Sequence, residues 1–235
     1  MNRARVTSPT TPADIDPPAR VELPARVRPL ERRTLPRDTV ALARFLLGKI
    51  VVREWGTRRG AQSARGTTPA RLLMGRIVET EAYLEGDPAC HAFNGMTPRN
   101  RSLFLEAGHA YVYLCYGTSY MLNVSSEAAG VGAGVLLRAL EPLCGIEHMR
   151  HARRAGAARD LTRGPGRLSA ALGVDRRDDG IDLTRRGPLW LGDDGRAPDT
   201  IGESVRIGLT KGAEARLRFF IAGNGYLSGA RRLNA

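Results

Sequence analysis

The sequence predicts a single α+β domain, in which a curved, mostly antiparallel β-sheet is flanked by helices and preceded by a disordered N-terminal tail. The 235 residues are 42% hydrophobic and 26% charged, which is a globular composition of sufficient length for one core. Short strand patterns alternate with turn residues along most of the chain, and helical patterns are few and short. No internal repeat is visible.

Residues 1–34 are predicted to be a disordered tail rich in Pro and Arg, and residues 35–235 to form the folded domain. The first 36 residues hold seven of the 14 prolines and no aromatic residue. Such a segment cannot bury enough apolar surface to offset the entropy that is lost on ordering.

The domain is predicted to begin with a helix and two strands. Asp38 is a suitable N-cap for a helix that ends near Gly48, and its apolar face is formed by Val40, Ala43, Leu46 and Leu47. Strands are expected at residues 49–55 and 72–84. Between them, residues 56–71 are rich in Gly, Arg, Ser and Thr and should form a long exposed loop.

A turn-rich segment and a hairpin follow. Residues 85–103 are rich in turn formers, and residues 110–116 and 120–125 are predicted strands joined by a tight turn at residues 117–119. Pro142 should stop the next strand. The last predicted elements are a strand at 134–140, helices at 146–159 and 168–172, and strands at 204–209 and 216–222.

The net charge favours a polyanionic partner. The chain has 36 Lys and Arg against 24 Asp and Glu, a net charge of +12, and residues 150–186 contain ten arginines. Nucleic acid fits this excess better than a membrane does, although a merely solvated basic surface is equally compatible with it. No run of about 18 apolar residues is present, so a membrane-spanning helix is excluded. A secretory signal is not expected either, because the first residues lack its apolar segment.

The cysteines predict neither a disulfide framework nor a metal site. Cys90, Cys115 and Cys144 form no CxxC pair, and the four histidines do not complete a zinc pattern with them. We therefore expect a cytoplasmic protein without a structural metal.

Two glutamates share one face of the strand at 72–84. Alternation places Ile77, Glu79, Glu81 and Tyr83 on the same side, with the two carboxylates about 6.6 Å apart along the strand. Taken alone, this pair is more simply interpreted as the solvated face of an amphipathic strand.

Arg138 lies within an apolar run that is typical of a central strand. A buried guanidinium must pair with a carboxylate, or its desolvation is not compensated. Glu79 and Glu81 are the nearest candidates on a neighbouring strand. A structural ion pair and an arginine that orients a catalytic carboxylate are equally compatible with this pattern.

Four of the six tyrosines fall within ten residues, namely Tyr111, Tyr113, Tyr116 and Tyr120. Cross-strand packing would explain most of them. A tyrosine at a hairpin tip has little core to fill, however, and on a basic protein it is suited to wedge between bases or to stack on one. His91 alone is more simply a surface histidine.

Six segments occur in the order of one known family, and the chain closely resembles the alkyladenine (3-methyladenine) DNA glycosylases over residues 35–228. The segments are GRIVETEAY at 75–83, His91, TPRN at 97–100, YVYLCYG at 111–117, NVSS at 123–126 and LLRALEP at 136–142.

The resemblance implies a monofunctional glycosylase that hydrolyses the N-glycosidic bond of damaged purines in double-stranded DNA, with no metal, no cofactor and no lysine Schiff base. It implies a monomer in the bacterial cytoplasm, associated with the nucleoid. Glu81 would activate water, and Arg138 would hold Glu81 and that water. The remaining assignments are a base pocket of Tyr83, His91, Tyr113 and Asn123, an intercalating Tyr116, and DNA backbone contacts by Thr97, Arg99, Asn100 and Arg167.

Two other functions remain open from the residues. A non-catalytic DNA-damage-binding protein would keep the basic surface and the wedge but use Glu81 and Arg138 as a structural pair. A hydrolase of free nucleosides would keep the pocket without a duplex.

Overall fold

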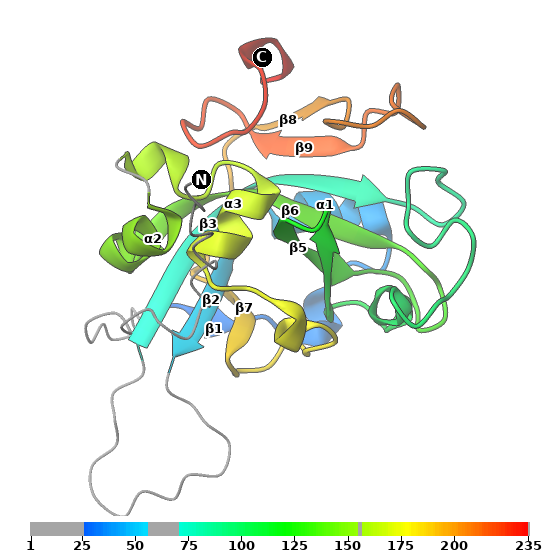
Figure 1. Cartoon of the computed structure of the whole chain (residues 1–235), viewed down its shortest axis with the longest axis horizontal. Helices are drawn as coiled ribbons and strands as arrows, with labels where there is room; N and C mark the ends of the chain where they lie inside the picture. Colours follow the sequence, from blue (N-terminus) through cyan, green and yellow to red (C-terminus); the bar gives the residue numbers. More distant parts are fainter. Residues whose placement is uncertain (1–25, 56–70, 155–156, 235) are drawn as a thin grey trace, which may run out of the picture.

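The computed structural model describes residues 26–55, 71–154 and 157–234, which form one nine-stranded, wholly antiparallel sheet with three α-helices (Figure 1). The strand order is β1-β7-β2-β3-β6-β5-β4, with β9 paired to β3 and β8 to β9. The predicted α+β class is confirmed. The strands are β1 (Arg28–Pro29), β2 (Ile50–Trp55), β3 (Arg71–Tyr83), β4 (Ala110–Cys115), β5 (Ser119–Ser125), β6 (Gly134–Cys144), β7 (Leu189–Asp193), β8 (Ile201–Ser204) and β9 (Arg218–Ile221).

The helices cover the sheet through one main core. Helix α1 (Thr39–Leu46) packs on β3, β6 and β9, helix α3 (Pro165–Ala171) packs on β5 and β6, and helix α2 (Ile146–Arg153) packs on α3. The predicted cap of α1 is confirmed, because the backbone N–H of Ala41 donates to Asp38 Oδ1 at 2.7 Å. Short 3₁₀ segments lie at Arg32–Thr34, Arg101–Phe104, Ala158–Asp160, Arg176–Asp178 and Arg231–Leu233.

Strand β3 is the central strand, and its length decides what surrounds its two glutamates. Along one edge it pairs with β6 over most of its 13 residues. Along the other edge β2 pairs with its first half, and β9 pairs with residues Glu79, Thr80 and Glu81. Glu79 and Glu81 are therefore flanked by strands on both sides, and neither has any exposed surface. The interpretation as a solvated face is wrong.

Two consecutive β-bulges set the direction of the side chains at this point. Val78 is an extra residue on β3, because Ile77 pairs with Leu140 and Glu79 with Ala139. Arg138 is an extra residue on β6, because Thr80 then pairs with Leu137. A bulge re-aims the side chains that follow it. Glu79, Glu81 and Tyr83 thus keep a common face as predicted, but Ile77 lies in the main core instead of sharing that face.

The hairpin turn lies one residue earlier than predicted. Tyr116, Gly117 and Thr118 form the loop between β4 and β5, and the backbone N–H of Thr118 donates to the carbonyl of Cys115 at 3.1 Å. The backbone φ angles of Tyr116 (49°) and Gly117 (69°) are both positive, as in a type I′ turn. Tyr116 therefore occupies the tip of the hairpin and not the end of a strand.

The predicted domain boundary at residue 35 is too late. Arg28–Pro29 pairs with Gly192 and Asp193 of β7, and Val27 and Leu30 are buried, so disorder is wrong for residues 26–34. The segment itself has few apolar residues, but its pairing with β7 supplies the packing that orders it. The sequence patterns did not predict β7 either. Residues 1–25 and residues 56–70 of the loop predicted at 56–71 lie outside the described part of the chain, and residue 71 begins β3.

Several predicted ends also differ. Strand β6 continues past Pro142, because β5 no longer pairs with it there and a missing N–H costs nothing on a free edge. Helix α2 ends at Arg153, since Arg154 has a left-handed backbone (φ 48°). Helix α3 starts at Pro165, in the first turn that proline favours. The strand predicted at 204–209 is wrong beyond its first residue, because β8 spans Ile201–Ser204 and no strand covers residues 205–209.

Candidate active site

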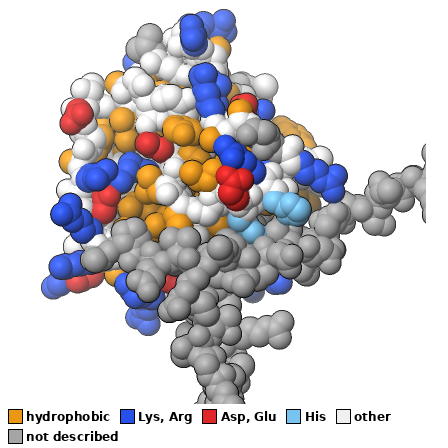
Figure 2. Space-filling view, turned by 90° about the vertical axis from the view of Figure 1, so that its left-hand side faces the viewer, with side chains coloured by type: hydrophobic (Ala, Val, Ile, Leu, Met, Phe, Trp, Pro, Cys, Tyr) orange, Lys and Arg blue, Asp and Glu red, His pale blue; other side chains and the backbone are white. Residues whose placement is uncertain are grey.

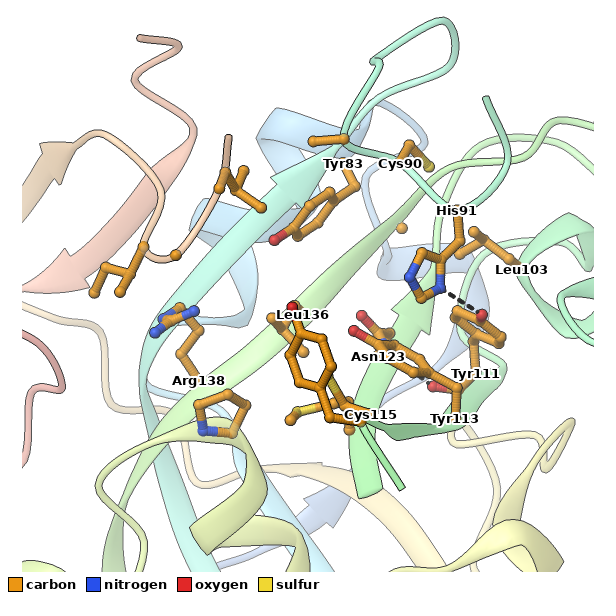
Figure 3. A pocket seen from close by; sticks show the side chains of 18 residues that line it. Tyr83, Cys90, His91, Leu103, Tyr111, Tyr113, Cys115, Asn123, Leu136 and Arg138 are labelled. Atoms are coloured by element: carbon orange, nitrogen blue, oxygen red, sulfur yellow. Dashed lines mark hydrogen bonds between the residues drawn. The ribbon is translucent and has the colours of Figure 1, made fainter. Parts of the chain in front are cut away.

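A pocket of about 350 Å³ opens beside the hairpin tip, within the size range of small-ligand sites (Figure 3). Arg138 lies on one side of it, His91 and Tyr111 lie on the other, and Tyr83 is above (Figure 3). Its walls come from the end of β3, from β4, β5 and β6, and from two loops. The lining residues include Tyr83, Ala89, Cys90, His91, Leu103, Tyr111, Tyr113, Cys115, Tyr116, Met121, Asn123, Leu136, Arg138, Pro165, Ile207, Gly208 and Leu209.

Glu81 lies directly behind the pocket wall and accepts three hydrogen bonds. Its Oε2 accepts from Arg138 Nη1 at 3.0 Å and from the hydroxyl of Tyr83 at 2.9 Å, and its Oε1 accepts from the backbone N–H of Ile207 at 2.7 Å. All three donors belong to residues that line the pocket. A carboxylate offers about four acceptor positions, so the network fixes Glu81 and leaves one position for a further donor such as water.

Arg138 bridges the two glutamates of β3. Its Nε donates to Glu79 Oε1 at 2.9 Å, and its Nη1 donates to Glu81, so the guanidinium serves both as a buried ion pair and as a support for Glu81. Burial alone would raise the pKa of Glu79, but the charges of Arg138 and Arg218 outweigh it and hold that pKa below its ordinary value. This geometry is thus compatible with both predicted roles of Arg138, a structural ion pair and an arginine that orients a catalytic carboxylate.

Arg218 on β9 is a site component that the sequence analysis missed. It has no exposed surface, and its Nε donates to Glu79 Oε1 at 2.8 Å. The signal that identified Arg138, an arginine inside an apolar strand, was also present at Leu217-Arg218-Phe219-Phe220. Ser228 completes the cluster, since its backbone N–H and its hydroxyl both donate to Glu79.

Tyr83 is held by Glu81 on its hydroxyl and by Arg206 on its ring. Burial and the negative charge of Glu81 raise the pKa of Tyr83, so its hydroxyl stays protonated. The guanidinium of Arg206 lies 4.7 Å from the ring centroid, in the range of a cation–π contact. Arg206 also donates to Asp87, an ion pair between segments 119 residues apart that no local sequence pattern indicates.

The opposite wall is aromatic. His91 Nδ1 lies 2.8 Å from the hydroxyl of Tyr111, and the rings of His91 and Tyr113 are 4.4 Å apart in an edge-on arrangement. Partial burial and the nearby positive charge of Arg99 lower the pKa of His91, which is therefore neutral at pH 7. Burial raises the pKa of Tyr111 and of Tyr113, and both stay protonated.

Asn123 and Tyr116 both line the pocket, but they differ in exposure. Asn123 is 6% exposed, and its Nδ2 donates to the backbone carbonyl of Tyr111 at 3.0 Å, which fixes its amide against the pocket floor. Tyr116 is 95% exposed at the hairpin tip, where it borders the pocket mouth. Six residues are predicted for catalysis and the base pocket. Five of them line the pocket, and the sixth, Glu81, is hydrogen-bonded to two of these five, Tyr83 and Arg138.

The four residues predicted to contact the DNA backbone differ in availability. Arg99 and Arg167 are exposed, with single hydrogen bonds to the Leu114 carbonyl and to Asp160, and Thr97 is exposed as well. Asn100 is only 4% exposed, and its amide binds the carbonyls of His91 and Gly95 and the backbone N–H of Thr97. Asn100 therefore holds the loop that carries His91 and does not offer its side chain to a phosphate.

The charged surface is mixed. On the side of the molecule where α2 lies, Lys and Arg side chains are spread over the surface with fewer Asp and Glu between them (Figure 2). Within the described residues, no three His, Cys, Asp or Glu side chains gather closely enough to hold a metal ion. Among the helices described, none is both long and apolar enough to cross a membrane.

Comparisons with known proteins give a consistent result. A family model described as methylpurine-DNA glycosylase matches residues 33–225. A protein of Mesorhizobium japonicum named "Putative 3-methyladenine DNA glycosylase" is 58% identical over 205 residues, which cover 87% of this chain and 92% of that protein. Proteins of the same name from Paraburkholderia phytofirmans and Chlorobaculum parvum are 49% identical over 208 residues (88% of this chain, 91% of that protein) and 44% identical over 195 residues (82% and 87%).

Proposed function

The chain belongs to the methylpurine-DNA glycosylase family, as its motifs indicated, and on this premise we propose that it flips damaged purines out of duplex DNA and hydrolyses their N-glycosidic bond with a water activated by Glu81. As a member of this family it is a hydrolase of N-glycosyl compounds of the 3-methyladenine DNA glycosylase type, and its substrate is DNA. The product would be an abasic site, the entry point of base excision repair.

The observation that carries the mechanism is the Glu81 network. Three donors from pocket-lining residues orient the carboxylate, and the free acceptor position would take the attacking water. General-base assistance of this kind contributes roughly 10²–10⁴-fold. The same negative charge, close behind the pocket wall, would stabilise the positive charge that develops on the sugar as the bond to the base breaks.

Flipping is required because the duplex hides the sugar C1′ from water, and it costs a few kcal/mol. Tyr116 supports this step, since a fully exposed aromatic ring at a hairpin tip is suited to fill the gap that the extruded nucleotide leaves. Damaged bases pair poorly and are extruded more easily, which provides a first level of selection.

The aromatic pocket would provide the second level of selection. An alkylated purine is electron-poor or cationic and stacks well on the faces of Tyr83 and Tyr113. A neutral His91 adds no positive charge that would repel such a base. The fixed amide of Asn123 would disfavour the exocyclic amine of guanine at the pocket floor.

Hydrolysis would invert the anomeric carbon. A single water that attacks the face opposite the leaving base gives inversion, as in inverting glycosidases. We further propose that the protein acts as a monomer and that Thr97, Arg99 and Arg167, which are exposed, contact DNA phosphates beside the lesion.

The test is release of free 3-methyladenine or hypoxanthine from duplex DNA in the presence of EDTA. Glu81→Gln keeps the shape of the side chain and should lower the single-turnover rate of base release at least about a hundredfold, while binding of the lesion duplex is retained. Glu141→Gln, on the neighbouring strand and outside the pocket, is the matched control and should keep the wild-type rate.

Each failure has a different meaning. Full activity of Glu81→Gln would make the proposed mechanism wrong. Lesion binding without base release by the wild type would instead indicate a non-catalytic damage-binding protein. Equal turnover of free nucleosides and duplex DNA would indicate a nucleoside hydrolase.

A further inference from the structure

Glu79, like Glu81, has no exposed surface, and its carboxylate accepts four hydrogen bonds. Its Oε1 accepts from Arg138 Nε (2.9 Å), Arg218 Nε (2.8 Å) and the Ser228 hydroxyl (2.7 Å), and its Oε2 accepts from the Ser228 backbone N–H (2.5 Å). Neither Glu79 nor Arg218 has any exposed surface or lines the pocket. Glu81 also has no exposed surface, but all three of its donors line the pocket, whereas Arg138 is the one partner of Glu79 that does. Glu79 and Arg218 therefore lie one layer further from a substrate than Glu81.

Glu79 and Arg218 nevertheless complete a charge-balanced cluster with the two groups that the mechanism uses. Two carboxylates, Glu79 and Glu81, face two guanidiniums, and Arg138 contacts both carboxylates. Because a guanidinium is rigid and planar, the bond from its Nε to Glu79 fixes the direction in which its Nη1 points toward Glu81. Arg138 is the extra residue of a bulge, so its backbone is not paired with a residue of β3. Regular strand pairing therefore does not set the direction of its side chain.

Arg218 in turn is held at every edge of its guanidinium. Besides Glu79, it donates to Ser204 Oγ and the Leu233 carbonyl at 2.8 Å each, to Asn234 Oδ1 at 2.6 Å and, more weakly, to the Ser228 carbonyl at 3.4 Å. Its position is thus set by β8 and by the segment 228–234. Glu79 is held between the guanidiniums of Arg218 and Arg138. The orientation of Arg138 therefore depends on Glu79 and Arg218, which do not line the pocket.

We propose that Glu79 and Arg218 are positioning residues of the active site, which fix the guanidinium of Arg138 and through it the carboxylate of Glu81. This inference rests on the proposed function of Glu81 and extends it to a second layer of the same site. A misplacement of a reacting group by about 1 Å is sufficient to cost about a hundredfold in rate. A layer that holds Arg138 is therefore expected to act on the rate and not on DNA binding.

The direct test compares Glu79→Gln with the wild type. Glutamine keeps the size and an acceptor for Ser228, but it removes the charge and directs an NH₂ group toward donor atoms. The single-turnover rate of base release should fall at least about tenfold, and Kd for the lesion duplex should change by less than about threefold. Asp178→Asn is the matched control. It breaks another buried ion pair, that of Asp178 with Arg53, which lies outside the pocket, so it should lower Tm but leave the rate unchanged.

A double-mutant cycle separates positioning from general destabilisation. In an Arg138→Gln background, Glu79→Gln should change the remaining rate by less than about threefold, because the group through which it acts is gone. Effects that multiply fully would overturn the proposal, as would an unchanged rate for Glu79→Gln alone. If Glu79→Gln does not fold, Ser228→Ala removes one hydroxyl shared by Glu79 and Arg138 and should give a smaller loss of rate with Kd unchanged.

The NMR signal of the Arg138 Nε–H provides a readout that is independent of activity. It can be assigned by its absence in Arg138→Gln, and its exchange with solvent should speed up markedly in Glu79→Gln but not in Asp178→Asn. An unchanged signal would refute the positioning role. A wild type that shows this coupling but releases no base would refute the proposed function and leave the positioning of Arg138 intact.

Discussion

Tyr116 occupies a position that is unfavourable for its own backbone. Its φ of 49° is in the left-handed region, which costs a non-glycine residue about 1–2 kcal/mol, and the turn it begins prefers Asn followed by Gly. The side chain is 95% exposed and recovers none of this cost by packing. Such strain at an exposed aromatic residue supports the intercalating role that we propose for Tyr116.

The variant Tyr116→Asn should therefore separate stability from activity. We expect Tm to stay the same or to rise by about 1–3 °C, because Asn suits the left-handed turn position. Base release from duplex DNA should fall at least about tenfold, since no side chain then fills the gap in the helix. Differential scanning fluorimetry and single-turnover assays measure the two effects, with Thr118→Ala in the same turn as control. Equal losses on single- and double-stranded substrates would argue against a wedge.

The chemistry of single residues made part of the site predictable. Arg138 lies in an apolar strand, and a buried guanidinium needs a carboxylate, which led directly to Glu79 and Glu81. The same reasoning applies to Arg218, which lies in the strand predicted at 216–222, but its partner Glu79 was already matched to Arg138. The ion pair of Arg206 could not be predicted from the sequence, because its partner Asp87 is distant along the chain and only the fold brings the two together.

At the scale of elements, the sequence predicted the strands around the site and the hairpin of β4 and β5, but it predicted neither β1 nor β7 and none of the bulges. Alternation along β3 placed Glu79, Glu81 and Tyr83 on one face, and this is confirmed. The bulge at Val78 reverses the side on which Ile77 lies, and no feature of the local pattern marks it. Strands β1 and β7 stabilise each other across more than 160 residues, so neither short apolar segment is recognisable by itself.

A buried ion pair between Asp87 and Arg206 is one of the contacts that attach the loop carrying His91 to the rest of the fold. Arg206 donates to both carboxylate oxygens of Asp87 and to the carbonyls of Ala82 and Gly212, and it stacks on Tyr83. The adjacent backbone N–H of Ile207 donates to Glu81. Asp87 thus connects the stability of the loop to the geometry of the pocket.

Asp87→Asn should lower Tm at pH 7 by roughly 5–10 °C, because it leaves the buried Arg206 without a charged partner. Burial alone would raise the pKa of Asp87, but hydrogen bonds from Arg206 and from the backbone hold it below its ordinary value. The ion pair is fully present above about pH 4, the usual range of an unfolded Asp, and is lost as the pH falls through the depressed folded value. The Tm difference between wild type and variant should therefore shrink below about pH 4.

The matched control is Asp194→Asn, which breaks the ion pair with Arg76 at the other end of β3. It should also lower Tm, and the stabilisation by this ion pair is again lost in acid, because the hydrogen bond and charge of Arg76 hold the pKa of Asp194 below its ordinary value. Only Asp87→Asn should slow base release at a temperature where both variants are folded. An equal slowing by both would show that the effect is general destabilisation.

At the scale of the whole molecule, part of the positive charge behind the net +12 is used inside the fold. Many arginines are used within the fold, including the buried Arg53, Arg138, Arg206 and Arg218, each of which pairs with a carboxylate. The ones that remain exposed, such as Arg99 near the hairpin and Arg167 on α3, are available for phosphates. The composition alone could not separate these two groups, because burial depends on the complete fold.

A salt titration tests whether this charge acts on duplex DNA. Each phosphate that the protein neutralises contributes a slope of about −0.9 to a plot of log affinity against log salt concentration, so at least three contacts predict a slope of about −3 or steeper for kcat/KM on a lesion duplex. Free inosine carries no phosphate and should show almost no slope. Arg167→Ala should make the duplex slope shallower by about one unit, whereas Arg196→Ala, exposed at the end of β7, should leave it unchanged. A flat response on the duplex would mean that the basic surface is only solvated and that the pocket acts on free nucleosides, which would remove the need for Tyr116 as well.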